Sequence, residues 1–111
     1  MKTQLIGAIA AATLALGAMV APATAEENFI VVQSTTSTQN SGLLDAILPA
    51  FTEKSGIEVR VVAVGTGQAI KNAENGDGDV LLVHAKPAEE KFVAAGGGVE
   101  RFDVMYNDFV V

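Results

Sequence analysis

The stretch FIVVQSTTSTQNSG, residues 29–42, decides how the rest of the sequence is interpreted. It opens with four adjacent apolar residues, which are typical of a strand buried on both faces of a parallel sheet. Five hydroxyl-bearing residues then follow from Ser34 to Thr38, and a helical pattern of apolar residues begins near Leu43. A strand, a hydroxyl-rich turn and a helix start in this order predict an α/β fold with a polar turn at one edge of its sheet.

The hydroxyl-rich turn offers many hydrogen-bond donors to one point. Hydroxyl groups can rotate toward a bound oxygen atom, and the first N–H groups of a helix lack partners within the helix and favour negative charge. No Lys or Arg lies in residues 29–42, so the pattern favours an anion held by dipoles and hydrogen bonds. Ser and Thr are also ordinary capping residues. A loop that only caps the following helix is therefore the alternative.

The rest of the chain alternates between strand and helix patterns. Strands are predicted over 28–33, 57–64 and 79–84, with a further extended segment from 104. Helices are predicted over 41–54, around 69–73 and from Pro87 to the glycines at 96–98; Pro49 lies inside the first, and Gly56 is placed to cap it. A β-α-β-α-β-α-β order with short connections predicts a mostly parallel sheet with helices on both faces.

The same alternation brings three turns together. Ligands bind at the carboxyl ends of the strands in sheets of this kind. Turns at 34–38, 65–67 and 84–86 are therefore expected at one edge, and two of them join a strand to a helix through Gly or hydroxyl residues. Two helix starts that face one crevice favour an anion site more than either turn alone.

The N-terminal 25 residues predict a cleaved secretory signal peptide. Lys2 gives a positive start, residues 5–20 are apolar, and small residues at 23 and 25 form a cleavage site. A membrane anchor is the alternative, but the apolar run is rich in Ala and Gly and short for a span. Export fits a chain without cysteine if it functions in a bacterial periplasm. Residues 26–111 then form one small domain, and their apolar end leads us to expect an N-terminal fragment of a longer protein.

Composition and missing motifs exclude several functions. A net charge of −6 argues against nucleic acid or an anionic membrane surface as the main partner. The calcium-like loop at 75–79 lacks its required glycine and closing acid, and the glycine pair at 65–67 lacks the third glycine of a dinucleotide site. A single histidine excludes a multi-histidine metal site, and the lack of a Gly-x-Ser-x-Gly motif argues against a hydrolase. We expect no metal centre, no cofactor and no enzyme activity. His84 is either one hydrogen-bond donor to a ligand or a hydrogen-bonded side chain at the sheet edge.

Four blocks of sequence, at 34–44, 63–67, 78–85 and 104–110, resemble in the same order the motifs of tungstate-binding proteins from ABC import systems. The resemblance runs from residue 29 to residue 111. It implies a monomeric, two-lobed periplasmic protein that closes on a tetrahedral oxyanion and delivers it to a membrane permease, with this chain as its first lobe. In that family a Thr usually occupies the position of Ser34. The anion-binding residues that the resemblance implies are Ser34, Thr35, Thr36, Ser37, Thr66 and Gly67.

The chemistry of the hydroxyl-rich turn narrows the choice of anion. Tungstate and molybdate are fully ionised near neutral pH and only accept hydrogen bonds, whereas phosphate keeps a proton part of the time and benefits from a carboxylate. No carboxylate lies in residues 34–39, which favours tungstate or molybdate, and the resemblance favours tungstate. A binding protein for molybdate, phosphate or sulfate, and an exported enzyme or sensor domain on the same lobe, are the alternatives.

Overall fold

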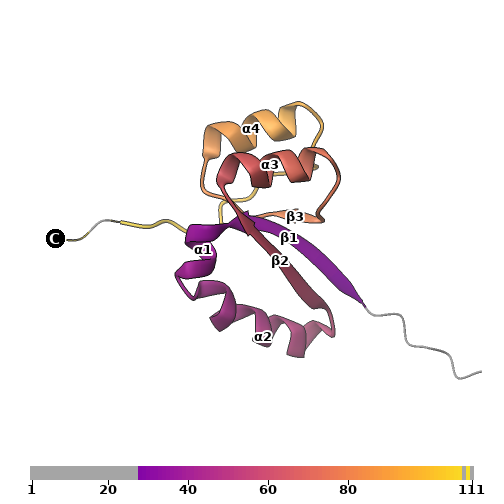
Figure 1. Cartoon of the computed structure of the whole chain (residues 1–111), viewed down its shortest axis with the longest axis vertical. Coiled ribbons are helices and arrows are strands. Elements are labelled where there is room, and N and C mark those ends of the chain that lie inside the picture. Colours follow the sequence, from indigo (N-terminus) through magenta and orange to yellow (C-terminus); the bar gives the residue numbers. More distant parts are fainter. Residues whose placement is uncertain (1–27, 109, 111) are drawn as a thin grey trace, which may run out of the picture.

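A three-stranded parallel sheet forms the centre of the molecule, with the strand order β2-β1-β3 (Figure 1). The computed structural model describes residues 28–108 and 110. The predicted signal peptide, residues 1–25, lies outside the described residues. Within the part that the structure describes, no helix combines the length and apolar character needed to cross a membrane. The elements in chain order are β1 (Phe29–Thr35), α1 (Thr36–Asn40), α2 (Leu43–Ser55), β2 (Glu58–Val64), α3 (Thr66–Glu74), β3 (Val80–Leu81) and α4 (Lys86–Ala94).

The strand order places the helices on both faces of the sheet. From β1 the chain crosses in one direction to β2, and from β2 it returns past β1 to β3. Because crossovers between parallel strands are right-handed, this reversal sends α2 and α3 to opposite faces. Figure 1 shows α1 and α2 on one side of the strands and α3 and α4 on the other. The predicted α/β fold, a parallel sheet covered on both faces, is confirmed.

The buried apolar core is small and draws one residue from each of four elements. Its members, which are Val32 of β1, Leu44 of α2, Ala69 of α3 and Phe92 of α4, are the buried hydrophobic side chains among the described residues. The central position of β1 buries four consecutive residues, 32–35, three of which are polar. Hydrogen bonds must therefore stabilise the middle of the sheet together with apolar packing.

The predicted helix at 41–54 is formed as α2, which begins two residues later and ends one residue later than expected. Asp45 in the first turn and Lys54 in the last turn complement the helix dipole. The N–H of Gly56 donates to the carbonyl of Thr52 at 2.9 Å, and Gly56 has a φ of 71°, which a residue without Cβ adopts without strain. Pro49 lies inside the helix and does not end it.

The hydroxyl-rich stretch is placed differently from the prediction. β1 continues through Ser34 and Thr35, which pair with Ala63 and Val64 of β2. The strand was expected to end at residue 33, because Ser and Thr favour turns and caps. Pairing with β2 outweighs that preference. The short helix α1 was not predicted, since its sequence TSTQN has no apolar periodicity.

The third and fourth predicted strands are shorter than expected or not formed. β3 covers Val80 and Leu81 instead of 79–84, and Leu82 still donates its N–H to the carbonyl of Gln33 at 2.9 Å. After Gln33, β1 has only Ser34 and Thr35 before α1 begins at Thr36. Residues 104–108 are exposed and form no strand. An extended segment becomes a strand only beside a partner strand, and within residues 28–108 this segment has none.

Gln33 is a buried polar residue on the central strand. Its side chain is only 2% exposed. Its Nε2 donates to the carbonyl of Asp77 at 2.7 Å, and its Oε1 accepts from Nδ2 of Asn72 at 3.0 Å. One amide thus ties β1 both to α3 and to the loop that leads into β3.

We expect Gln33→Leu to lower the free energy of unfolding by about 1–3 kcal/mol, because the substitution leaves two part-buried polar partners without a hydrogen bond. Urea unfolding of the 111-residue chain measures this. Gln68→Leu on the exposed face of α3 is the matched control, and it should change stability by no more than about 0.5 kcal/mol. Equal losses of unfolding free energy in both variants would show that the buried Gln33 amide stabilises the domain no more than an exposed one.

Candidate functional site

The crevice lies where the chain leaves the sheet in two directions. From β1 it continues to α1 and α2 on one face, and from β3 it continues to α4 on the other (Figure 1). Such switch points are where open α/β sheets bind ligands. An open cavity of about 750 Å³ occurs here. It is lined by Ser37, Thr38, Ser41, Gly42, Leu43, Ala46, His84, Met105, Tyr106 and Asn107.

The hydroxyl of Thr35 lies at the centre of a cluster of polar side chains beside the crevice, which also contains Ser37, Thr38 and His84. Its Oγ1 lies 2.8 Å from Oγ1 of Thr38, 3.2 Å from Oγ of Ser37 and 3.3 Å from Nε2 of His84. The same oxygen accepts the N–H of Thr38 at 3.3 Å and so caps α1. Thr35 is buried at the end of β1, so its hydroxyl is a fixed point that positions the side chains of Ser37, Thr38 and His84.

Ser34 and its neighbours divide into buried and exposed members. Ser34 is fully buried, and its hydroxyl donates to the carbonyl of Leu82 at 2.8 Å. This bond uses the single proton of Ser34, so the side chain joins β1 to the end of β3 instead of presenting its O–H to the crevice. Thr36 and Ser37, at the start of α1, are exposed. Of the hydroxyl run at 34–38, Ser37 and Thr38 line the crevice.

Thr66 and Gly67 begin α3 at the same edge of the sheet. The pairing of Thr35 with Val64 places the end of β2 next to the start of α1. No side chain caps α3, and the N–H of Ala69 donates to the carbonyl of Gly65 at 2.9 Å. The N–H groups before Ala69 therefore precede the first bonded turn. These two residues follow β2, on the far side of β1 from His84, and they do not line the crevice.

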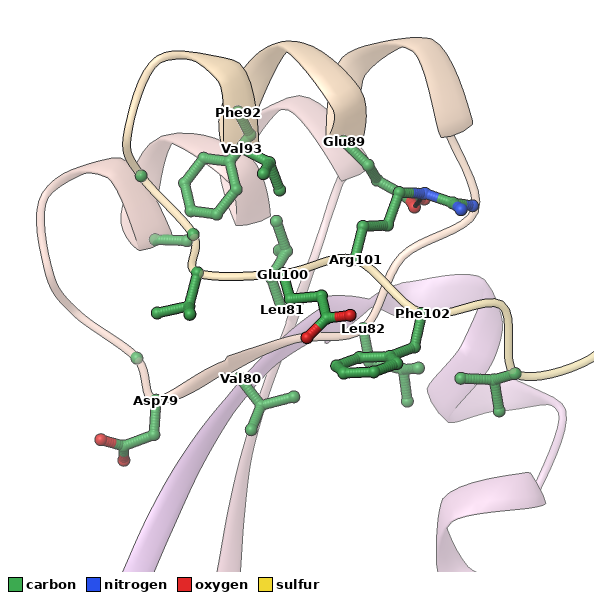
Figure 2. Close-up of a pocket in the computed structure, with 16 residues that line it drawn as sticks. Asp79, Val80, Leu81, Leu82, Glu89, Phe92, Val93, Glu100, Arg101 and Phe102 are labelled. Carbon is green, nitrogen blue, oxygen red and sulfur yellow. Dashed lines mark hydrogen bonds and ion pairs between the residues drawn. The ribbon is translucent and has the colours of Figure 1, made fainter.

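The third turn is held by Glu89, which lies in the first turn of α4. One carboxylate oxygen accepts the N–H of Ala85 at 2.9 Å, and the other accepts Nε of Arg101 at 2.7 Å. Figure 2 shows the two side chains meeting beside α4. Arg101 also donates to Asp103 at 2.8 Å. This clamp fixes the residue that follows His84.

The charges of this clamp reinforce one another. Hydrogen bonds to Asp103 and Glu89 raise the pKa of the Arg101 guanidinium above its usual value. The hydrogen bond and the charge of Arg101, with a smaller effect of Lys86, lower the pKa of Asp103. Arg101 and Asp103 therefore stay charged near neutral pH, and their ion pair helps to hold the turn.

A second cavity, of about 570 Å³, lies between α4, β3 and residues 99–104. Figure 2 shows Phe92 and Val93 extending from α4 above Leu81 and Leu82. Its wall is mainly apolar, without a hydroxyl cluster, so it does not suit a small anion. No group of three His, Cys, Asp or Glu residues within the described range could hold a metal ion.

Sequence reasoning missed two features of the crevice. It left Thr38 out of the expected anion-binding residues, although Thr38 lines the crevice and makes the shortest contact to the Thr35 hydroxyl. It did not place residues 105–107 beside the crevice. The hydroxyl run that continues through Thr38 was a usable signal for the first; the approach of 105–107 depends on the path of the chain after α4, and no local pattern indicates it.

A parallel α/β domain with a polar crevice at the carboxyl ends of its strands defines a class of ligand-binding domains. Residues 20–111 match the family described as the PBP superfamily domain. The chain belongs to this family.

Named relatives agree with the fold. The tungstate-binding protein TupA of Peptoclostridium acidaminophilum is 63% identical over 82 residues, which cover 74% of this chain and 29% of that protein. The tungstate-binding protein TupA of Campylobacter jejuni is 51% identical over 75 residues, which cover 68% of this chain and 28% of that protein.

Solved structures extend the comparison. The tungstate-binding protein TupA from Desulfovibrio alaskensis G20 superposes with a TM-score of 0.72 at 54% identity, over 73% of this chain and 32% of that chain. The tungstate ABC transporter structure from Geobacter sulfurreducens gives a TM-score of 0.71 at 57% identity, over 74% of this chain and 35% of that chain. The chain thus spans about a third of the length of the relatives that it matches.

Proposed function

We propose that this chain belongs to the substrate-binding component of an ABC importer that captures tungstate in the periplasm, without catalytic turnover. The observation that carries the proposal is the cluster of hydroxyls and one imidazole nitrogen within 2.8–3.3 Å of the Thr35 Oγ1 at the switch point. Relatives that are 51–63% identical and named for tungstate binding support it. The proposed anion-binding residues are Ser34, Thr35, Thr36, Ser37, Thr66 and Gly67. Ser37 lines the crevice itself, Ser34 and Thr35 support it from the buried end of β1, and Thr66 and Gly67 contribute from the start of α3 at the same edge of the sheet.

The composition of the crevice favours a fully ionised oxyanion. None of the residues that line it is Asp, Glu, Lys or Arg. An anion there is held by hydroxyl and N–H donors, which suit tungstate and molybdate because these ions only accept hydrogen bonds. A protonated phosphate benefits from a carboxylate that accepts its proton, and no Asp or Glu lines the crevice.

The length of the relatives supports a longer protein with a second lobe. Because the chain spans about a third of theirs, we propose that residues 26–111 form the first lobe of a two-lobed protein, exported by a signal peptide at 1–25. The two lobes close on the anion, and the monomer then docks on a membrane permease. Nucleic acid is not a partner in this proposal, because the chain is acidic, with a net charge of −6.

Titration calorimetry of the complete gene product that contains these residues tests the function. Tungstate, molybdate, sulfate and phosphate are compared under identical conditions. The proposal expects tungstate to bind most tightly and phosphate least. Equal affinity for phosphate and tungstate would contradict the proposed specificity, and esterase turnover by the same protein would favour an enzyme.

Residues 26–111 alone should bind tungstate at least about a hundredfold more weakly than the complete protein. A single lobe leaves part of the anion in water, so two or more charge-assisted hydrogen bonds, about 1.5–3 kcal/mol each, are lost. Calorimetry on the purified segment measures the difference. Sub-micromolar affinity in this segment would show that one lobe is sufficient.

A further inference from the structure

We propose that His84 is a positioning residue that directs the hydroxyl protons of the crevice, so that binding of an oxyanion is coupled to uptake of a proton by its imidazole. This inference rests on the proposed function and adds a pH dependence to it. It starts from the position of Nε2, which lies 3.2 Å from Oγ of Ser37 and 3.3 Å from Oγ1 of Thr35.

A count of protons shows why the state of His84 matters. Thr35, Ser37 and Thr38 each have one hydroxyl proton, whereas an imidazole nitrogen either donates or accepts. When Nε2 accepts, Ser37 or Thr35 must donate to it, and that proton is turned away from the crevice. When Nε2 carries a proton, either in the neutral Nε2–H tautomer or in the imidazolium form, it donates to one of these oxygens, and the hydroxyl protons are free to point elsewhere.

An oxyanion selects the second arrangement. A fully ionised tetrahedral anion only accepts hydrogen bonds, so it gains one donor when the Ser37 proton turns toward the crevice. The neutral Nε2–H tautomer allows this turn without any uptake of a proton, but only the imidazolium form adds a positive charge to a crevice whose lining contains no Lys or Arg. That charge is what couples binding to proton uptake. His84 is exposed, so solvent can supply the proton. The anion therefore binds the protonated form more tightly, and by linkage it favours uptake of that proton.

Few other ionisable groups face this imidazole. The residues of α1 and α2 that line the crevice are uncharged, and Tyr106 is the titratable group that the 105–107 segment contributes. On the side of α4, Lys86 begins the helix and Glu89 is engaged with Ala85 and Arg101. Tyr106 is thus the group whose removal provides a matched control.

The test is calorimetry of the complete gene product with tungstate and with molybdate at pH 6.5, 7.5 and 8.5, in two buffers of different ionisation heat. We expect the affinity to fall about tenfold from pH 6.5 to 8.5, as one linked proton allows, with uptake of up to one proton per anion. In His84→Gln, which retains an N–H donor but does not titrate in this range, binding should persist with a flat pH profile. Tyr106→Phe should keep the slope of the unmodified protein.

The outcomes separate the two proposals. Binding that is independent of pH and takes up no proton, or an unchanged slope in His84→Gln, would overturn the role of His84 and leave oxyanion binding intact. Absence of heat with every oxyanion at every pH would overturn both. If His84→Gln does not fold by circular dichroism, His84→Asn replaces it, and the proton uptake of the unmodified protein decides the question by itself.

Discussion

Thr35→Val should weaken tungstate binding by the complete protein about tenfold or more. The substitution keeps the shape of a buried side chain and removes the one oxygen that contacts Ser37, Thr38 and His84 and caps α1. Loss of a cap costs about 1 kcal/mol, and loss of the hydrogen bond that the Thr35 hydroxyl is proposed to donate to the anion costs about 1.5–3 kcal/mol. Calorimetry measures the affinity, and urea unfolding measures the smaller loss of stability.

Two further variants show whether the oxygen of Thr35 is the cause. Thr35→Ser keeps the hydroxyl and should retain most of the affinity. Thr52→Val removes a hydroxyl from α2, where no hydrogen bond of that side chain occurs among the described residues, and should leave binding unchanged. A Thr35→Val protein that binds tungstate as tightly as the unmodified protein would exclude the cluster from the site.

Leu44→Ala should lower the free energy of unfolding of the 111-residue chain by about 2–5 kcal/mol, because it removes a fully buried side chain and leaves a cavity. Leu44 is 2% exposed and is the residue through which α2 enters the small core. A loss of this size is a large fraction of the stability of a small domain. Urea unfolding monitored by circular dichroism measures it.

The control for this change lies one turn further along the same helix. Ile47 is 47% exposed, so Ile47→Ala should change the free energy of unfolding by no more than about 0.5 kcal/mol. A similar loss in both variants would mean that α2 contacts the sheet through a different face from the one in the structure.

Much of the fold could be predicted because its signals are local. The apolar run at the start of β1, the helical spacing around Leu44 and the glycine at position 56 each indicate one element, and the β-α alternation then indicates a parallel sheet. Boundaries were less predictable. Ser34 and Thr35 favour a turn when they are considered alone, and their place in β1 depends on residues 63 and 64, which lie far away in the sequence.

The candidate site shows the same division. The hydroxyl run and the Gly-Thr-Gly turn indicate where donors gather, because parallel strands all end at one edge. The contacts of His84 with Ser37 and Thr35 join residues that are 47 and 49 positions apart. No local pattern predicts them. The shortness of β3 and the missing strand at 104–108 likewise depend on which neighbours are available, which the local sequence does not specify.

The order of the three strands has one more consequence. The two crossovers run in opposite directions from β1 and β2, so the segments that follow β1 and β3 leave the sheet on opposite faces. The crevice between them therefore forms without removing side chains from the core. The exposed residues Thr36 and Ser37 can therefore be exchanged at little thermodynamic cost to the domain. If the proposed site is correct, its choice of anion could change in evolution while the surrounding fold stays the same.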